Sequence, residues 1–282
     1  MDTNKIRVIA YGITLGSFAL FGLDLANRSK IAVASTEVGN LTLVANGEDF
    51  VRQGFVSRDG WQISFDHLYV NVGEATAMAT ESSFEPQKDD TKESIEYESK
   101  VEFLDAPKVT DLAAGEANAE PIVVASAEVN PGLYNALAWE ITTADIDSPI
   151  AGKTMNLIGQ ATKDGETVDF DLSFDRPTEY ICGEFVGDRR LGIVETDSPG
   201  TVEMTFHFDH LFGDFDTPPE DALNQGALGF EPIAQLASNN TVKLNDGELA
   251  NQLAPDDYQS LQAALVGLGH VGEGHCVVTS TQ

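Results

Sequence analysis

Short apolar runs separated by turn residues are the feature that most restricts how this chain can fold. The runs are alternating or wholly apolar and cover Asn40–Ala45, Trp61–Val72, Val101–Leu104, Ile122–Val129, Leu133–Thr142, Met155–Ala161, Thr167–Phe174 and Thr201–Phe208. Turn residues such as Asn130-Pro131-Gly132 separate them. Because no helical pattern alternates with these runs, we predict a mainly β protein, an antiparallel β-sandwich of the immunoglobulin or transthyretin type.

The pattern changes after Phe215. Pro219-Glu220-Asp221 begins a predicted helix that runs through Leu236, and Pro255-Asp256-Asp257 begins another that runs through Val266. We therefore predict a sandwich core at 35–215, followed at 216–282 by a small helical insertion and a C-terminal strand that closes the same domain.

An excess of carboxylates limits the partners of the chain. Sixteen Lys and Arg residues stand against 46 Asp and Glu residues, which gives a formal net charge of −30. Such a chain cannot neutralise a run of phosphates, so nucleic-acid binding is excluded, as is electrostatic attachment to anionic lipid. The stretch 81–102 alone carries eight carboxylates and three lysines, and we expect it to be a solvated, mobile acidic insertion between strands.

The N-terminus has the pattern of an export signal. Lys5 and Arg7 precede the uncharged run Val8–Leu23, whose 16 residues fall short of the roughly 20 that span a bilayer. Ala32-Val33-Ala34 is a small-x-small sequence of the kind that signal peptidase accepts. We predict a cleaved signal peptide at 1–34 and a periplasmic or secreted protein with no membrane span in the mature chain; the alternative is an uncleaved N-terminal anchor.

Export determines how the two cysteines are interpreted. In an oxidising compartment, Cys182 and Cys276 are expected to form a disulfide bond. The alternative is a pair of soft metal ligands, which is the weaker interpretation because the two residues lack a Cys-x-x-Cys spacing.

Histidine is scarce and clustered, and it points to a metal site. Two of the five histidines lie in near-identical pentads, Phe65-Asp66-His67-Leu68-Tyr69 and Phe208-Asp209-His210-Leu211-Phe212. Imidazole is the commonest metal ligand, and a neighbouring carboxylate can orient it. The predicted ligands are His67, His207, His210 and His275, with Asp66 and Asp209 as orienting or additional ligands. Whether His270 takes part is left open.

Two other interpretations of the histidines remain. The histidines are structural if the strand is continuous, because the side chains of His207 and His210 would then point to opposite faces of the sheet. These two side chains converge only if the strand ends near Phe208. A hydrolase base is the third interpretation, although Gly-x-Ser-x-Gly, His-Glu-x-x-His and Walker motifs are absent from the sequence.

The segment 238–249 has some features of a calcium loop but lacks regularly spaced acidic ligands, which favours a purely structural loop.

These residues carry a resemblance to a known family. Asp59-Gly60-Trp61, Leu104-Asp105 and Asn130-Pro131-Gly132-Leu133-Tyr134 resemble exported bacterial β-sandwich proteins whose better-described relatives are the MbnP-like periplasmic copper-binding proteins. His207 to Phe212 and Gly274-His275-Cys276 resemble exported proteins that share a histidine–aspartate pentad and a His-Cys end. The resemblance implies an exported sandwich that binds a metal. No motif here matches the family's methionine and modified-tryptophan chemistry, so copper is not assigned on this ground.

The combined prediction is an exported protein that sequesters or delivers a divalent transition metal and is not an enzyme. Three or four imidazoles suit zinc or copper, and added carboxylates would admit iron or manganese. Its partners would be the metal ion and a metal transporter or outer-membrane receptor. The competing hypotheses are a metal-free adhesion or ligand-binding sandwich and, less favoured, a metallohydrolase.

Overall fold

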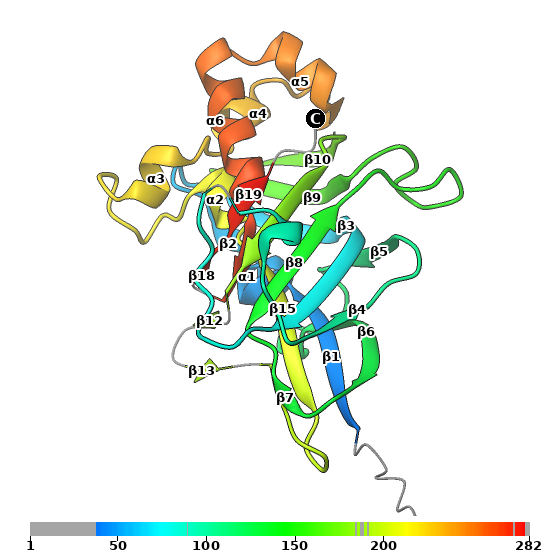
Figure 1. The fold of residues 1–282 in the computed structure, drawn as a ribbon. Coiled ribbons are helices and arrows are strands. Elements are labelled where there is room, and N and C mark those ends of the chain that lie inside the picture. Colours follow the sequence, from blue (N-terminus) through cyan, green and yellow to red (C-terminus); the bar gives the residue numbers. More distant parts are fainter. Residues whose placement is uncertain are drawn as a thin grey trace, which may run out of the picture. The chain divides into compact units, whose positions relative to one another are not determined.

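A computed structural model describes residues 38–88, 90–183, 185–186, 189–190, 192–272 and 274–279; the side chains of 185–186, 189–190 and 275 are outside this description. The predicted signal peptide at 1–34 also lies outside the described residues. Strands account for 43% of the described residues and helices for 18%, which confirms a mainly β fold consistent with a sandwich. Figure 1 shows how these elements are arranged.

Two sheets contain most of the strands. The five-stranded sheet has the order β18-β17-β15-β1-β6, with bounds Gly274–His275, Gly269–Val271, Gly200–Phe206, Gly39–Asn46 and Ile122–Val129. The ten-stranded sheet has the order β16-β10-β9-β3-β8-β11-β19, with bounds Thr241–Asn245, Glu166–Phe174, Met155–Lys163, Gln62–Ala79, Ala136–Ile141, Thr178–Cys182 and Val277–Thr279. Its long strand β3 also pairs with β2 (Phe55–Val56), β4 (Ser99–Glu102) and β5 (Lys108–Asp111). Two small pairings complete the list, β7 (Gly132–Leu133) with β14 (Ile193–Val194) and β12 (Phe185–Val186) with β13 (Arg189–Arg190).

The strand pairing is mixed rather than wholly antiparallel. Most neighbours are antiparallel, as predicted, but β1 pairs with β15 and β10 pairs with β16 in parallel. A parallel pair requires a long connection between its strands, and long segments of chain separate both pairs. The parallel pairing of β1 with β15 brings the residues that follow Asn46 beside the residues that follow Thr205.

The core lies between the two sheets and is rich in aromatic side chains. Trp139 of β8 stacks on Tyr180 of β11, with ring centroids 4.2 Å apart, and its ring meets Phe206 of β15 edge-on at 5.0 Å. All three side chains are almost fully buried. Burial of such large apolar surfaces is the main source of stability in a sandwich of this kind.

Seven helical segments join the strands: α1 (Glu48–Gln53), η1 (Lys92–Ser94), α2 (Asp209–Phe212), α3 (Ala222–Gly226), α4 (Glu231–Ala234), α5 (Asp246–Gln252) and α6 (Pro255–Val266) in the described part of the chain. The predicted helix from Pro255 through Val266 is confirmed as α6. The predicted helix at 219–236 is wrong, because the chain breaks it into α3 and α4. Gly229 adopts a φ of +81° between them, and Pro232 cannot occupy a helix interior. Among the described helices, none is long and apolar enough to cross a membrane.

The segment with features of a calcium loop is a structural connection. Its residues form β16 and the start of α5, where Asn245 and Glu248 make a capping box: each side chain accepts a hydrogen bond from the other residue's backbone N–H, at 3.0 and 2.9 Å. Asp246 accepts hydrogen bonds from Tyr258 and Gln262 of α6. These oxygens hold helices in place, as the structural interpretation predicted.

The acidic stretch at 81–102 is only partly solvated, which corrects the expectation for it. Ser99–Glu102 pairs with β3 as strand β4, and the side chain of Ile95 is 6% exposed. Ile95 packs in a small apolar cluster with Met78 and Ile181. The charged composition of this stretch therefore did not indicate that it contains the buried side chain of Ile95 and the strand β4.

The predicted disulfide bond is confirmed. Cys182 at the end of β11 bonds to Cys276, 94 residues later, with their Cα atoms 4.4 Å apart. The bond joins the segment that contains β17 and β18 to the ten-stranded sheet, although those strands belong to the other sheet.

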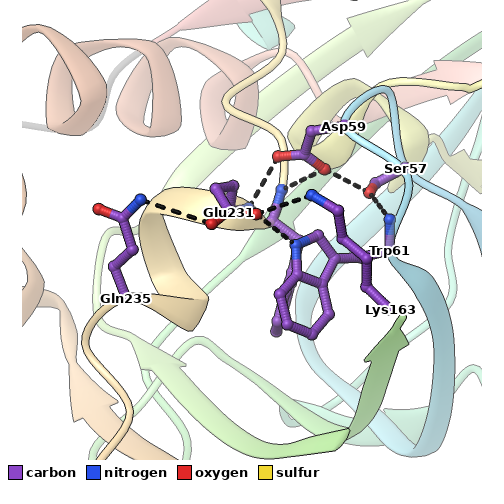
Figure 2. A network of polar contacts seen from close by, with 7 residues as sticks. Ser57, Asp59, Trp61, Lys163, Glu231 and Gln235 are labelled. Carbon is purple, nitrogen blue, oxygen red and sulfur yellow. Dashed lines mark hydrogen bonds and ion pairs between the residues drawn. The ribbon is translucent and has the colours of Figure 1, made fainter. Parts of the chain in front are cut away.

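A polar network ties the helical insertion to the turn before β3 (Figure 2). Asp59 accepts hydrogen bonds from the backbone N–H groups of Phe230 and Glu231, at 3.2 and 2.7 Å, and so caps α4. The Glu231 carboxylate in turn accepts from the Trp61 indole at 3.0 Å and from Lys163 at 2.9 Å. The Asp59-Gly60-Trp61 sequence thus has a structural role at this junction.

Candidate metal centre

The candidate site is formed where strand β15 ends. The strand stops at Phe206, the His207 N–H donates to Leu268 O at 3.1 Å, and the His210 N–H donates to His207 O at 3.2 Å. The chain then enters α2, so the condition for convergence of His207 and His210 is met. Their ring centroids are 5.3 Å apart.

Three donor groups come together there. One ligand atom from each of His207, Asp209 and His210 lies within 4.8 Å of the others. Nδ1 of His207 is 3.8 Å from Oδ1 of Asp209. Nitrogen and oxygen ligands of zinc lie 2.0–2.2 Å from the ion, so two of them in a tetrahedron are roughly 3.4 Å apart. The observed separation is therefore close to that of two ligands on one ion.

The hydrogen bonds of His207 leave the correct nitrogen available for a metal. Nε2 of His207 lies 3.2 Å from the backbone oxygen of Gly272. A carbonyl oxygen only accepts, so in the neutral ring Nε2 carries the proton and Nδ1, the atom nearer Asp209, keeps its lone pair. Metal-ligating histidines commonly donate their second ring N–H to such a carbonyl, which fixes the tautomer and the ring orientation.

Asp209 has a buried oxygen that needs a partner. Its Oδ1 is fully buried and accepts no hydrogen bond from the described part of the chain. Burial of a carboxylate oxygen without a hydrogen bond is costly. A cation held between this oxygen and Nδ1 of His207 would satisfy both groups.

Two neighbours of the site, His270 and Glu48, are not among the ligands predicted from the sequence. The His270 ring centroid is 4.3 Å from that of His207 and 5.1 Å from that of His210, and Nε2 of His270 faces Gly267 O at 3.2 Å. Oε1 of Glu48 lies 3.8 Å from Nε2 of His207, and Glu48 adopts an unusual φ of +58°. His270 could be suspected from the clustering of histidines. Glu48 had no signal in the sequence, because only the parallel pairing of β1 with β15 brings it there.

The structure places two of the other predicted ligands, Asp66 and His67, elsewhere. Asp66 and His67 are both exposed, beside a bulge in β3. Nδ1 of His67 is 2.7 Å from Oδ2 of Asp111, and its ring stacks on Tyr69. Neither Asp66 nor His67 belongs to the donor group found among the described residues. The backbone of His275 pairs with His270, but its side chain is outside the described part.

A cavity adjoins the site. Its volume is about 340 Å³, and it is bordered by His210 and by apolar, mostly small residues that include members of α3 and α6. His210 therefore connects the donor group to a space that a small molecule can enter.

Comparison with known proteins does not add a family. No protein-family model, no curated protein and no solved structure matches this chain. The resemblance to the MbnP-like proteins accordingly stays a prediction.

Proposed function

We propose that this protein is an exported metal-binding protein that holds a divalent transition metal at His207, Asp209 and His210. The observation that carries the proposal is the approach of their three ligand atoms to within 4.8 Å of one another. Two imidazoles and a carboxylate suit zinc first and copper second. A metal transporter or outer-membrane receptor would exchange the ion with it.

The proposed location of the protein rests on its disulfide bond. A disulfide such as Cys182–Cys276 persists in oxidising compartments and is rare in reducing ones. This supports a periplasmic or secreted protein, in agreement with the export signal predicted at 1–34. A relation to the MbnP-like proteins remains part of the proposal.

The proposed ligand set is narrower than the one expected from the sequence. His67 and Asp66 are left out because His67 already pairs with Asp111 and both side chains face solvent. A metal-free sandwich with structural histidines is the main alternative, since the bond from His207 to Gly272 would serve it equally well. The metal content of the protein decides between the two.

The cavity favours a second candidate function, a metal-dependent hydrolase. Such an enzyme needs an open coordination position and a carboxylate base. Glu48 is the candidate base; its Oε1 lies 3.8 Å from Nε2 of His207, which is not the nitrogen proposed to bind the metal. Hydrolysis of 4-nitrophenyl esters by zinc-loaded protein, abolished in Glu48→Gln and retained in His67→Ala, would support this function over simple metal storage.

The proposed metal site is tested by zinc binding to protein purified without a His-tag. The titration is done in about 1 M salt, where charges are screened within about 3 Å, because 46 acidic residues bind cations weakly elsewhere. We expect one tightly bound zinc per chain, lost in His210→Ala because a ligand is removed.

His67→Ala is the matched control, since it alters the same position of the other pentad. It should retain one zinc per chain. Full stoichiometry in His210→Ala, or equal loss in the two variants, would overturn the assignment.

A further inference from the structure

The cavity beside His210 has the composition of a binding site for an apolar molecule. Its walls include Ala222, Leu223 and Gly226 from α3, and Ala263 and Ala264 from α6. Apart from Leu223 these residues are small, and their size leaves the space between the helices open. His210 is the polar residue on this wall, and it belongs to the candidate metal group.

We propose that this cavity binds a small organic molecule with an uncharged apolar body and one metal-ligating head group, and that the head group reaches the metal bound at His210. The inference rests on the proposed function. A volume of about 340 Å³ is at the lower end for ligand pockets, which suits a molecule smaller than a typical drug.

The charge of the protein favours a neutral head group. A formal net charge of −30 repels anions from the surface. An alkyl body gains from leaving water for the Ala and Gly walls, whereas a charged body would lose its hydration there. A neutral nitrogen or sulfur donor on an aliphatic or aromatic body meets both conditions.

The test uses cobalt-loaded protein at about pH 8 and a series of probes with one head group: 1-methyl-, 1-butyl- and 1-hexylimidazole. Their binding is followed through the visible spectrum of the cobalt ion. Each buried methylene should tighten binding about fourfold, so the hexyl probe should bind far more tightly than the methyl probe.

Two variants fill the cavity from opposite walls. A Cβ added at Gly226 would meet no heavy atom within 4 Å, so Gly226→Leu has room for its side chain, and Ala263→Leu enlarges a residue that borders the cavity from α6. Both variants should keep cobalt binding, but they should bind the hexyl probe only as tightly as the methyl probe. Gly132→Leu is the matched control: its Cβ also meets nothing within 4 Å, and it does not border the cavity.

The outcomes separate this inference from the proposed function. Tight cobalt binding without any dependence on chain length in the unaltered protein overturns the cavity ligand and leaves the metal site standing. The same holds if both filled variants keep full affinity for the hexyl probe, or if that probe binds equally well without cobalt. Failure to bind cobalt at all overturns the proposed function, and this inference with it.

Discussion

Two near-identical pentads adopt different structures in this molecule. Phe65 to Tyr69 lies in strand β3, where Asp66 and His67 face solvent beside a bulge. Phe208 to Phe212 lies after the end of β15 and forms α2, where Leu211 and Phe212 are buried and His210 meets His207. Four of the five residues are the same in both pentads.

The neighbours of each pentad, rather than its own residues, select the structure. The first pentad pairs with β9, where Gly159 permits close approach, since a Cβ there would overlap the backbone oxygen of Ser64. The second follows a strand whose pairing with β17 ends at Phe206, and one further hydrogen bond, from the His207 N–H to Leu268 O, precedes α2. Local preference for helix or strand is weak enough for tertiary contacts to override it.

Removal of the disulfide should have the largest effect and should separate the two regions. The double variant Cys182→Ser/Cys276→Ser frees a loop of 94 residues, and we expect the free energy of unfolding to fall by about 4–5 kcal/mol, as measured by urea denaturation. The segment around β17 should loosen most. Hydrogen exchange should therefore accelerate more at the His207 amide, bonded to Leu268, than at the Leu68 amide, bonded to Asp111. Equal acceleration would show that the second pentad does not depend on this segment.

Phe212→Tyr gives the second pentad the sequence of the first and should be clearly destabilising. The side chain of Phe212 is 1% exposed, and its ring lies 6.2 Å from Phe55 and 5.8 Å from Phe230. A hydroxyl in this apolar setting loses its water and finds no acceptor among these rings, so we expect a loss of about 1–3 kcal/mol. Urea denaturation measures it. An unchanged stability would mean that the hydroxyl reaches solvent and that α2 is less enclosed than described.

The sequence predicts strands and the disulfide well and the site only in part. Ile122–Val129 is confirmed at both ends because its apolar run and flanking turns are local signals. His67 appeared equivalent to His210 because sequence similarity carries no information about which strand lies opposite. Glu48 and His270 reach the site only through the pairing of β15 with β1 and β17. Long-range register of this kind has no local signature.

Glu231→Gln tests the link between the two regions with a smaller effect. The network in Figure 2 joins the turn before the first pentad to α4, which follows the second. The hydrogen bond from Lys163, followed by that from Trp61, lowers the pKa of Glu231 below its usual value. A carboxyl with a lowered pKa stabilises the fold above its unfolded pKa, and that contribution disappears as the pH falls through the folded pKa.

At pH 7 we therefore expect Glu231→Gln to be less stable than the unaltered protein. The loss of stability should be smaller than that caused by Phe212→Tyr, because the ion pair is solvent-exposed. The difference should begin to shrink as the pH falls past the usual carboxyl pKa of about 4.3, and it should vanish only at an acidic pH below the lowered pKa of the folded Glu231. Urea denaturation at both pH values measures it. A difference that persists unchanged in acid would assign the effect to packing rather than to charge.

Tyr69→Phe should have the smallest effect and is the most direct test of the comparison, because it gives the first pentad the sequence of the second. Tyr69 is half-buried in β3, opposite Asn156 of β9 and Asp111 of β5. These pairings do not involve its hydroxyl, so stability should change by no more than about 0.5 kcal/mol. Backbone chemical shifts of 65–69 should remain those of a strand, and zinc stoichiometry should stay at one per chain. Helical shifts, or a second tightly bound zinc, would show that the pentad itself specifies the site. If neither appears, the chain contains two identical pentads that differ in structure only because their neighbours differ. Those neighbours are Gly159 and β9 for the first pentad and Leu268 and β17 for the second.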